Sequence, residues 1–336
     1  MKYIICEEPG RFILKEKVIP KPKKGESLLK IDRVGVCGTD IHAYGGSQPF
    51  FNYPRILGHE VAATYIEGEA PGFVKGDALT FIPYFNCDQC IACKNGRPNC
   101  CSSIAVFGVH IDGAMAEYVV IPDQFLISGQ GLNYSELALV EPLAIAAHGI
   151  RRAAVNSNDI VLVMGAGPIG LGVIQFAKLT GARVLIMDIN EHRLSYCKNE
   201  LGITSIINPN QDDVYSKLSQ LTEGSMPTVI VDATGNQRVM NNAFGYMAHG
   251  GRYVLVGLQK GDLTFNHPEF HKRESTLLSS RNATREDFNY VIECIKSKKI
   301  NAKKFITHQI QFDEMPQRFD EMFSPENKVI KALINF

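Results

Sequence analysis

Residues 159–170 read Asp159-Ile-Val-Leu-Val-Met-Gly-Ala-Gly-Pro-Ile-Gly170 and join an apolar run to a glycine-rich turn. The apolar run has the length and β-branched content of a buried strand, and the stretch from Ile169 to Leu179 is compatible with a helix. A second apolar run, Val184 to Asp188, follows that stretch. A strand, a glycine turn, a helix and another strand predict a βαβ unit with parallel strands.

The same alternation continues through the middle of the chain. A helical pattern covers Glu191 to Leu201, and the short apolar run from Ser205 to Asn208 follows it. Two further apolar runs, Val229 to Asp232 and Arg252 to Gly257, are separated by another helical stretch. Strands that alternate with helices predict right-handed crossovers and a doubly wound parallel sheet.

The first third of the chain has a different pattern. Short runs such as Leu28 to Val34 and Glu117 to Ile121 are bounded by Gly, Pro and Asp, which predicts a β-rich domain with long loops. The tail contains a helical pattern near Arg285 to Ser297 and an apolar strand, Val329 to Phe336, which we expect to return to the first domain. Because 336 residues are more than a single hydrophobic core usually accommodates, we predict an α/β protein of two domains. The β-rich domain comprises residues 1–145 and 281–336, and the parallel-sheet domain comprises residues 146–280.

Composition narrows the class of partner. Lys plus Arg and Asp plus Glu number 35 each, so no net charge attracts the chain to nucleic acid or to a membrane surface. A small molecule is therefore the expected partner. No stretch approaches the roughly 20 apolar residues of a membrane span, and the first residues lack the pattern of a secretory signal. We expect a cytoplasmic protein.

The glycine turn, Gly165-x-Gly167-x-x-Gly170, indicates a dinucleotide site. The first glycine permits the tight turn, the second lets the backbone approach a pyrophosphate, and the third allows close helix–strand packing. Asp188 ends the next strand, where it can accept hydrogen bonds from an unmodified ribose, so NAD is favoured over NADP. The alternative is a glycine turn in another kind of α/β protein. Further cofactor contacts are expected from Pro168, Ile169, Arg193, Thr234, Val256 and Gly257, although Arg193 could equally be a solvated helix residue.

Four cysteines in one short loop indicate a first metal site. Cys87, Cys90 and Cys93 are spaced by two residues, and Cys101 follows after seven more. Four thiolates suit a tetrahedral structural zinc. A bacterial iron–sulfur run would place its fourth cysteine after three residues and follow it with proline, which this sequence does not do. Cys100 is adjacent to the fourth ligand position, but the spacing favours Cys101. The alternative to a metal site is four unliganded cysteines in one exposed polar loop.

A second metal site is predicted from residues that lie far apart in the chain. Cys37 and His59 are good zinc ligands, and the carboxylate of Glu141 can supply a third. Three protein ligands leave a position open for water or a substrate oxygen, as a catalytic zinc requires. Taken singly, Cys37 could be a buried thiol and His59 a structural histidine. Their occurrence together with a nucleotide turn favours the metal site.

Taken together, these motifs resemble the zinc-containing medium-chain dehydrogenase/reductase family across essentially the whole chain. That resemblance implies a GroES-like β-rich catalytic domain, a Rossmann domain for NAD, and two zinc ions per chain, one catalytic and one structural. It also implies a homo-oligomer, either a dimer or a tetramer. The matching segments are Cys37-Gly-Thr-Asp-Ile-His42, Gly58-His-Glu60, Gly76-Asp77, the four-cysteine loop, Asp112-Gly113, Glu141-Pro142 and the glycine turn.

The resemblance also implies roles for individual residues near the catalytic zinc. Cys37, His59 and Glu141 correspond to its ligands, and Glu60 to a carboxylate that approaches the metal transiently. Asp40 corresponds to a residue that orients the histidine ligand. Thr39 would take the alcohol proton and His42 would pass it to solvent.

Within the family, the chain is most similar to the bacterial sugar-acid branch of L-galactonate (or L-gulonate) 5-dehydrogenases. The segments that suggest this are Gly45 to Phe51, Pro268 to Lys272 and Ser280 to Thr284, and Ala43 departs from the aromatic residue usual in sorbitol dehydrogenases. We therefore expect hydride transfer from a secondary alcohol of a small polyhydroxy substrate to NAD. Arg281 is the candidate for binding a substrate carboxylate, with Asn282 beside it, although Arg281 could equally pair across subunits or with a cofactor phosphate. The alternatives are a polyol or L-threonine dehydrogenase, or a zinc- and NAD-binding protein without turnover.

Overall fold

The computed structural model describes residues 1–48 and 51–336. The chain divides into two compact units. Unit 1 comprises Met1–Ala144 and Asn282–Phe336, and unit 2 comprises Ile145–Arg281. The domain ranges predicted from the sequence differ from these units by one residue at each boundary.

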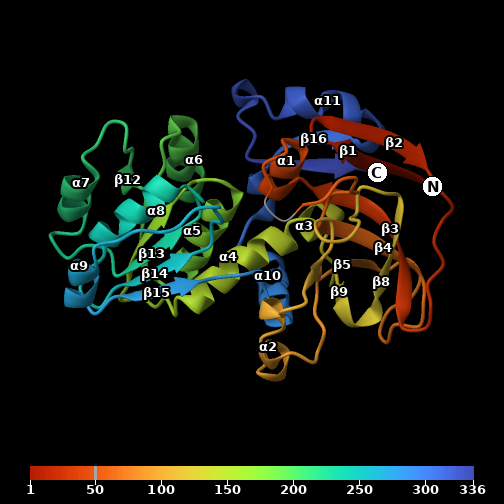
Figure 1. Ribbon diagram of the computed structural model, residues 1–336, viewed down its shortest axis with the longest axis horizontal. Coiled ribbons are helices and arrows are strands. Elements are labelled where there is room, and N and C mark those ends of the chain that lie inside the picture. The colour runs from red at the N-terminus through yellow and green to blue at the C-terminus, as the bar shows by residue number, and fades with distance from the viewer. Residues whose placement is uncertain (49–50) are drawn as a thin grey trace. The chain divides into compact units, whose positions relative to one another are not determined.

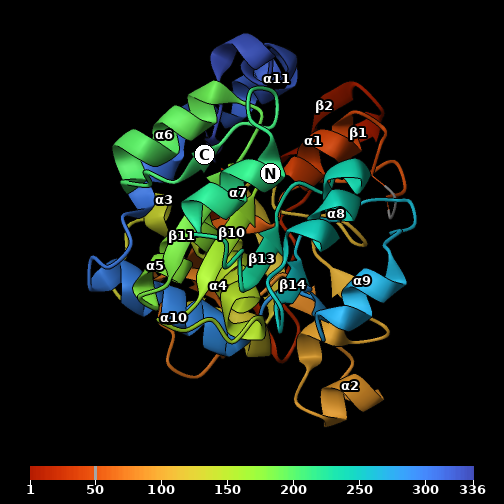
Figure 2. The ribbon, with the colours of Figure 1, turned by 90° about the vertical axis from the view of Figure 1, so that its left-hand side faces the viewer.

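Unit 2 contains a six-stranded parallel sheet with the strand order β12-β11-β10-β13-β14-β15. Figure 2 shows four of these strands side by side, in the order β11, β10, β13, β14. The chain runs outward from β10 to β12 and then returns to the other side of β10, so the order reverses between β10 and β13. In sheets of this kind, ligands bind at the carboxyl ends of the strands near that reversal. The strands are β10 (Ile160–Met164), β11 (Arg183–Met187), β12 (Ile206–Ile207), β13 (Val229–Asp232), β14 (Arg252–Leu255) and β15 (Thr276–Ser279).

Helices connect these strands and flank the sheet (Figure 1). They are α5 (Pro168–Leu179), α6 (Glu191–Leu201), α7 (Val214–Leu221), α8 (Gln237–Ala243), the 3-10 turn η3 (Phe244–Tyr246) and α9 (His267–Lys272). Side chains of the residues before α6, α7 and α8, namely Asn190, Asp213 and Asn236, each accept a hydrogen bond from a backbone N–H in the first turn. Such caps satisfy donors that a helix leaves unpaired, so the local sequence fixes where each helix begins. The doubly wound parallel sheet predicted from the sequence is thereby confirmed.

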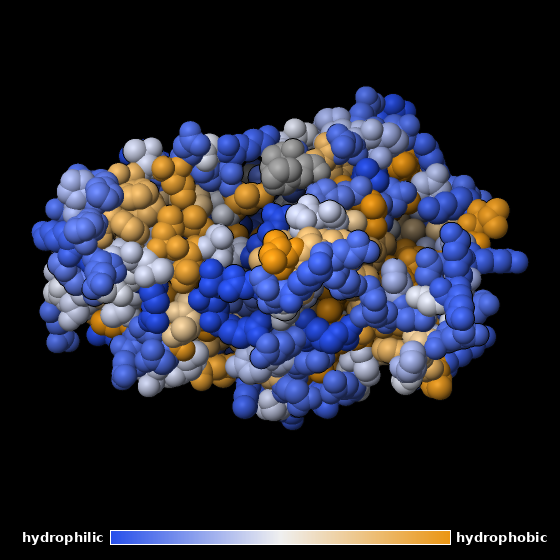
Figure 3. All heavy atoms as spheres, turned by 60° about the horizontal axis from the view of Figure 1, so that its bottom comes forward, coloured by the Kyte–Doolittle hydropathy of each residue, from blue (hydrophilic) through white to orange (hydrophobic). Residues whose placement is uncertain are grey.

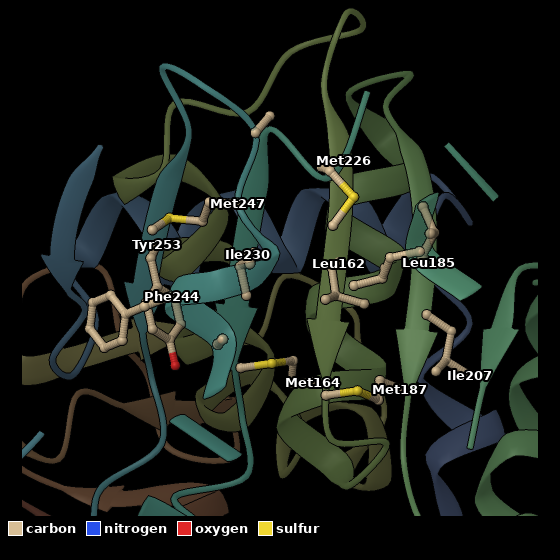
Figure 4. Packing of buried hydrophobic residues seen from close by; sticks show 13 residues of the cluster. Leu162, Met164, Leu185, Met187, Ile207, Met226, Ile230, Phe244, Met247 and Tyr253 are labelled. Carbon is tan, nitrogen blue, oxygen red and sulfur yellow. The ribbon is translucent and has the colours of Figure 1, made fainter. Parts of the chain in front are cut away.

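One face of the parallel sheet carries a continuous apolar core (Figure 4). Because side chains alternate along a strand, Leu162 and Met164 of β10 face the same side as Leu185 and Met187 of β11. Tyr253 of β14 joins them, and the core is closed by residues from the connecting helices and loops. These are Leu218, Met226, Ala243, Phe244, Met247 and Ala248. This packing holds the strands in register, and it therefore fixes the strand ends from which the nucleotide turn emerges.

Unit 1 is built around a seven-stranded sheet with the order β16-β17-β3-β4-β5-β9, in which β8 pairs with β3. The C-terminal strand β17 pairs with β3, so the tail returns to the first domain as predicted. Two small two-stranded sheets, β1-β2 and β6-β7, complete the strand structure of this unit in the described part of the chain. The strands are β1 (Lys2–Glu8), β2 (Arg11–Glu16), β3 (Glu26–Gly35), β4 (Glu60–Glu67), β5 (Ala78–Phe81), β6 (Tyr84–Phe85), β7 (Ala105–Val106), β8 (Tyr118–Pro122), β9 (Leu126–Ser128), β16 (Ile306–Gln311) and β17 (Lys331–Asn335).

Short helices connect the strands of unit 1 at several points. The α-helices are α1 (Gly38–Tyr44), α2 (Ile91–Lys94), α3 (Tyr134–Leu137), α10 (Arg285–Lys296) and α11 (Met315–Met322), while α4 (Val140–Arg152) crosses into unit 2. The 3-10 turns are η1 (Pro98–Cys100), η2 (Asp123–Phe125), η4 (Ala302–Phe305), η5 (Phe312–Glu314) and η6 (Pro325–Asn327).

One predicted strand is shorter than expected for a clear physical reason. The sequence suggested a strand from Arg252 to Gly257, but β14 ends at Leu255. The backbone N–H groups of Val256 and Gly257 both donate to the carbonyl of Asp232 at the end of β13, at 3.0 and 2.9 Å. The chain therefore turns across the end of the neighbouring strand instead of extending the ladder.

On the face drawn in Figure 3, apolar residues form small patches in a mainly hydrophilic surface. Exposed apolar side chains include Val18, Ile91 and Leu258. None of the helices in residues 1–48 and 51–336 combines the length and apolar character needed to cross a bilayer.

Candidate metal and nucleotide sites

Three predicted metal-site residues meet where strands β3 and β4 lie side by side. Cys37 follows β3 and is the N-cap residue of α1, and His59 directly precedes β4. Antiparallel pairing brings Gly35 opposite Glu60. As a result, one ligand atom each from Cys37, His59 and Glu60 lies within 4.8 Å of the other two. The strand pairing thus brings together thiolate, imidazole and carboxylate donors from separate segments.

Gly35 makes room for one of these donors. A Cβ atom at position 35 would lie 2.1 Å from Oε2 of Glu60, far inside van der Waals contact. A side chain at position 35 would displace the Glu60 carboxylate from its place against the backbone of β3. Gly35 therefore leaves room for a donor of the metal site, and this role was not predicted from the sequence.

Asp40 ties the two ligand segments together through their backbones. Its buried carboxylate accepts hydrogen bonds from the backbone N–H of Cys37 at 2.8 Å and of Gly58 at 3.2 Å. The expected bond to the histidine is absent: Oδ1 of Asp40 is 3.9 Å from Nδ1 of His59. That nitrogen is buried and has no hydrogen-bond partner in the described part of the chain. Asp40 therefore fixes the positions of the ligand-bearing loops, and its carboxylate lies near the imidazole of His59 without a hydrogen bond to it.

The two buried carboxylates of the site have different partners. Glu60 accepts two hydrogen bonds from the Lys331 ammonium, both at 2.7 Å, and Lys331 also donates to the carbonyl of Val36. Glu141 accepts a hydrogen bond from the Tyr84 hydroxyl on its Oε1 atom. Glu60, and not Glu141, belongs to the compact group of donors. From the resemblance, Glu141 is expected as a ligand and Glu60 as a carboxylate that approaches the metal transiently, and both roles stay predictions.

The electrostatics of this site indicate an excess of negative charge. Burial lowers the pKa of His59, but the neighbouring Cys37 and Asp40 raise that pKa well above its usual value. Burial, opposed by His59 and reinforced by the charge of Glu60, raises the pKa of Glu141 to about 7. Buried anions that favour protonated neighbours are well suited to a bound dication. Sulfur, nitrogen and oxygen donors together fit zinc, so the residues present match the predicted ion.

The proposed proton-relay residues lie on one short helix. Thr39 and His42 are three residues apart on α1 and so share one side of it. His42 is exposed, and its Nδ1 atom is 2.9 Å from Oγ of Ser47. Ser47 extends the polar path beyond His42 and was not predicted. Of the segment Gly45 to Phe51, residues 49–50 lie outside the described residues.

The cysteine loop forms a compact group of four thiols. The sulfur atoms of Cys87, Cys90, Cys93 and Cys101 all lie within 4.8 Å of one another. Backbone N–H groups of Cys87 and Ser103 point at the sulfur of Cys101, at 3.3 and 3.4 Å. Backbone hydrogen bonds from Cys93 and Ser102 lower the pKa of Cys90 to about 5. Such donors stabilise thiolates, the form that binds metal. Cys100 is exposed and lies outside the group.

Asn282 supports this loop. Its side-chain amide donates to the carbonyl of Asn99 at 3.1 Å. Asn282 is predicted from the sequence as a substrate residue, but its Nδ2 atom is hydrogen-bonded to the cysteine loop. Arg281, the other predicted substrate residue, is exposed and is the last residue of unit 2.

The glycine turn has the close contacts expected of a nucleotide site. A Cβ atom at Gly170 would lie 1.8 Å from the carbonyl oxygen of Gly165, so only glycine fits there. Gly167 is the N-cap residue of α5, and Pro168 and Ile169 begin that helix. Asp188 accepts from the backbone N–H of Ala166 at 2.6 Å and of Asn190 at 2.8 Å. Asp188, which follows β11, therefore stabilises the glycine turn that follows β10.

Further predicted cofactor residues lie near the same ends of the parallel strands. A Cβ atom at Gly167 would lie 3.8 Å from Nη1 of Arg193, so that guanidinium is close to the turn. The Thr234 hydroxyl donates to the buried carboxylate of Asp232 at 2.5 Å. A Cβ atom at Gly257 would lie 2.4 Å from Oδ2 of the same carboxylate. Asp232 thus organises the loops that carry Thr234, Val256 and Gly257.

Two important residues of the metal site were missed from the sequence. Tyr84 is one of several aromatic residues before the cysteine loop, and no local pattern connects it with Glu141. Lys331 offered a signal, because it is a lone charge within the apolar run Val329 to Phe336. A charge at an inward-facing position of a buried strand indicates a buried partner of opposite charge.

A dinucleotide turn on a doubly wound sheet, together with a thiolate–imidazole–carboxylate site, defines a zinc-dependent, nicotinamide-linked oxidoreductase. The chain belongs to the zinc-type alcohol dehydrogenase family, whose members act on CH–OH groups. Residues 23–130 match the alcohol dehydrogenase GroES-like domain, and residues 168–297 match the zinc-binding dehydrogenase domain. The predicted pairing of a GroES-like fold with a nucleotide-binding fold is confirmed.

Known proteins of this family align with the chain along its full length. An L-galactonate-5-dehydrogenase of Escherichia coli (strain K12) is 43% identical over 343 residues, which cover 100% of this chain and 99% of the relative. A sorbitol dehydrogenase of Halalkalibacterium halodurans is 32% identical, with 97% and 96% covered. Among solved structures, the short chain alcohol dehydrogenase rspB of E. coli CFT073, complexed with NADH, superposes with a TM-score of 0.92 at 31% identity. That match covers 100% of this chain and 99% of the other.

Proposed function

We propose that the protein oxidises the C5 secondary alcohol of a sugar acid such as L-galactonate or L-gulonate, with NAD as hydride acceptor. The observation that carries this proposal is the convergence of Cys37, His59 and Glu60 in a chain similar throughout its length to an L-galactonate-5-dehydrogenase. In this proposal, residues 1–145 and 281–336 form the catalytic domain and residues 146–280 bind NAD.

NAD is favoured over NADP by the residue at the end of β11. The Asp188 carboxylate accepts backbone hydrogen bonds from Ala166 and Asn190, which hold it beside the glycine turn. A negative charge held there would repel the 2′-phosphate of NADP and can accept hydrogen bonds from a ribose diol. Arg193, Thr234, Val256 and Gly257 would line the rest of the cofactor site.

The chain's own residues divide the work of the reaction. When bound, zinc supplies Lewis acidity that lowers the pKa of an alcohol hydroxyl, and NAD supplies the acceptor for the hydride. Cys37, His59 and Glu141 would hold the metal, with Glu60 in reach as a fourth donor. The Thr39 hydroxyl accepts the alcohol proton, and His42, bonded to Ser47, releases it to solvent. The substrate thus loses one hydride and one proton, and the alcohol becomes a ketone.

Arg281 would recognise the carboxylate of a sugar acid. A guanidinium can bind a carboxylate through two parallel hydrogen bonds, and the side chain of Arg281 is exposed. Asn282 would contribute from its backbone, since its amide nitrogen is bonded to Asn99. A neutral polyol or an alkanol would gain nothing from the charge of Arg281.

The protein would act as a homodimer or homotetramer. Strand β15 is an edge of the parallel sheet, and most of its side chains are exposed, with Leu277 at 38%. An edge strand with an exposed apolar side chain is a suitable surface for pairing with a second copy.

A substrate screen tests the proposal. Zinc-loaded protein is assayed for reduction of NAD and of NADP with L-galactonate, L-gulonate, sorbitol, L-threonine and ethanol. We expect the highest kcat/KM for a hexonate with NAD, and loss of turnover in Cys37→Ser without loss of NADH binding. Preference for sorbitol or L-threonine would contradict the sugar-acid assignment, and absence of turnover with every substrate would favour a non-catalytic role.

A further inference from the structure

We propose that Tyr84 is a positioning residue for the catalytic metal, because its hydroxyl fixes the Glu141 carboxylate through one oxygen. This inference rests on the proposed role of Glu141 as a zinc ligand. The Tyr84 hydroxyl donates to Oε1 of Glu141, and the two residues are 4% exposed each. The interaction joins strand β6, which leads into the cysteine loop, to the first turn of α4.

The position of the Tyr84 hydroxyl is fixed by its surroundings. The backbone of Tyr84 pairs with Val106 of β7. Its ring packs edge to face against Phe288 of α10, with ring centroids 6.5 Å apart, and Phe288 is fully buried. A tyrosine side chain has few rotatable bonds, so a buried ring that packs against Phe288 from a paired strand presents its hydroxyl at a defined point. The donor is therefore rigid, as a group that orients a ligand should be.

The hydrogen bond uses only one of the two carboxylate oxygens. With Oε1 on the Tyr84 hydroxyl, Oε2 is the atom through which Glu141 can bind an ion. A carboxylate ligand is normally held by such an outer partner, and removal of that partner typically lowers metal affinity by about 10–100-fold. Without the hydroxyl, a buried carboxylate oxygen would lose its donor and the carboxylate could rotate away from the orientation that binds zinc.

A role in packing alone makes a different prediction. Phenylalanine at position 84 keeps the ring and its contact with Phe288 and removes only the oxygen. If Tyr84 served only to fill space, Tyr84→Phe would leave the metal unaffected. Tyr65 provides a matched control, because it is also buried and its hydroxyl accepts from Ser27 and from the backbone of Ala70, outside the metal site.

The experiment compares Tyr84→Phe, Glu141→Ala, the double variant and Tyr65→Phe, all with the cysteine loop loaded. Zinc affinity of the second site is measured by competition with a chelator, and the cobalt-substituted proteins give visible spectra that report ligand geometry. We expect Tyr84→Phe to bind zinc about 10–100-fold more weakly and to shift the cobalt bands. The double variant should match Glu141→Ala, and Tyr65→Phe should match the unaltered protein.

Two results would overturn the inference. One is unchanged zinc affinity and an unchanged cobalt spectrum in Tyr84→Phe. The other is an equal further loss of affinity when Tyr84→Phe is added to Glu141→Ala, because the effect would then not pass through Glu141. Unaltered zinc affinity in Glu141→Ala would instead contradict the ligand assignment of the proposed function, so the two failures are distinguishable.

Discussion

The ammonium nitrogen of Lys331 lies 2.7 Å from each carboxylate oxygen of Glu60, and the side chains are only 2% and 1% exposed. Lys331 is on the C-terminal strand β17 and Glu60 begins β4, so the pair connects the tail of the chain to the metal site. Burial lowers the pKa of Lys331, but the charges of Glu60 and Cys37 raise it overall. The lysine thus remains charged and compensates part of the negative charge of the donors.

Removing the Lys331 ammonium should lower the stability of the protein. Lys331→Met leaves the Glu60 charge buried without its partner, and breaking a buried pair in this way typically costs about 3–5 kcal/mol. Denaturant unfolding of the zinc-loaded protein measures the change in the free energy of unfolding. The double variant Lys331→Met/Glu60→Gln should lose less unfolding free energy than Lys331→Met, because no unpaired buried charge remains.

Lys30 offers a matched control for that measurement. Its ammonium is 3.8 Å from Asp32 and its side chain is 48% exposed. An exposed pair contributes about 0–1 kcal/mol, so Lys30→Met should be nearly neutral. If Lys331→Met were no more destabilising than Lys30→Met, the buried pair of Lys331 and Glu60 would not contribute to stability as predicted.

The cysteine loop allows a paired test of the structural site. Cys93→Ser removes one of four grouped thiols, so we expect loss of one zinc per chain and a lower Tm, since structural zinc contributes directly to folding. Cys100→Ser changes an exposed neighbour outside the group and should keep both the zinc content and the Tm. Elemental analysis and thermal unfolding measure these quantities. Equal zinc loss in both variants would argue against Cys101 as the fourth ligand.

Gly170 should tolerate no side chain. In Gly170→Ala the new Cβ would meet the backbone carbonyl of Gly165 at 1.8 Å, and that atom can move only if the turn itself opens. We expect the overpacking to lower the free energy of unfolding by about 1–3 kcal/mol. We also expect weaker NADH binding in a fluorescence titration. Gly245→Ala is the control, because a Cβ there has no neighbour within 4 Å. Unchanged NADH affinity in Gly170→Ala would contradict the assignment of this turn to the cofactor.

The buried carboxylate of Asp159 should contribute to stability in a pH-dependent way. Burial raises its pKa, but hydrogen bonds from Asn156, Thr228 and Arg252 outweigh burial, and the folded pKa is lowered. A lowered folded pKa gives stability that is complete above the unfolded value, about 4, and is lost as the pH falls through the folded value.

Urea unfolding at several pH values tests this expectation. Asp159→Asn should be less stable than the unaltered protein above about pH 4, and the difference should narrow below that pH. The exposed Asp262 serves as the control, and Asp262→Asn should follow the unaltered protein. A difference that stays constant down to acid pH would show that the charge of Asp159 is not responsible.

Local patterns explain why much of the fold could be predicted. The strand, turn and helix around Gly165 to Gly170 are determined by short-range periodicity and by the need for glycine at close backbone contacts. The four-cysteine loop is equally local, and its spacing distinguished Cys101 from Cys100. Each feature lies within one continuous stretch of the chain, residues 159–179 for the first and 87–101 for the second.

The details of the metal site depend on contacts that no local pattern encodes. Whether Glu60 or Glu141 lies nearer to Cys37 depends on the register of β3 against β4 and on the partners of each carboxylate. Those partners, Lys331 and Tyr84, come from distant strands and were not predicted. The end of β14 was likewise decided by hydrogen bonds to Asp232 on a neighbouring strand.

The central claim is that residues remote in sequence hold a catalytic zinc ion. Anomalous diffraction at the zinc edge, on crystals of metal-replete protein, tests it most directly. We predict one peak among the four grouped cysteines and a second within bonding distance of Cys37 and His59, with a carboxylate of Glu141 or Glu60 beside it. An active, metal-replete protein with a peak only at the cysteine loop would contradict the account.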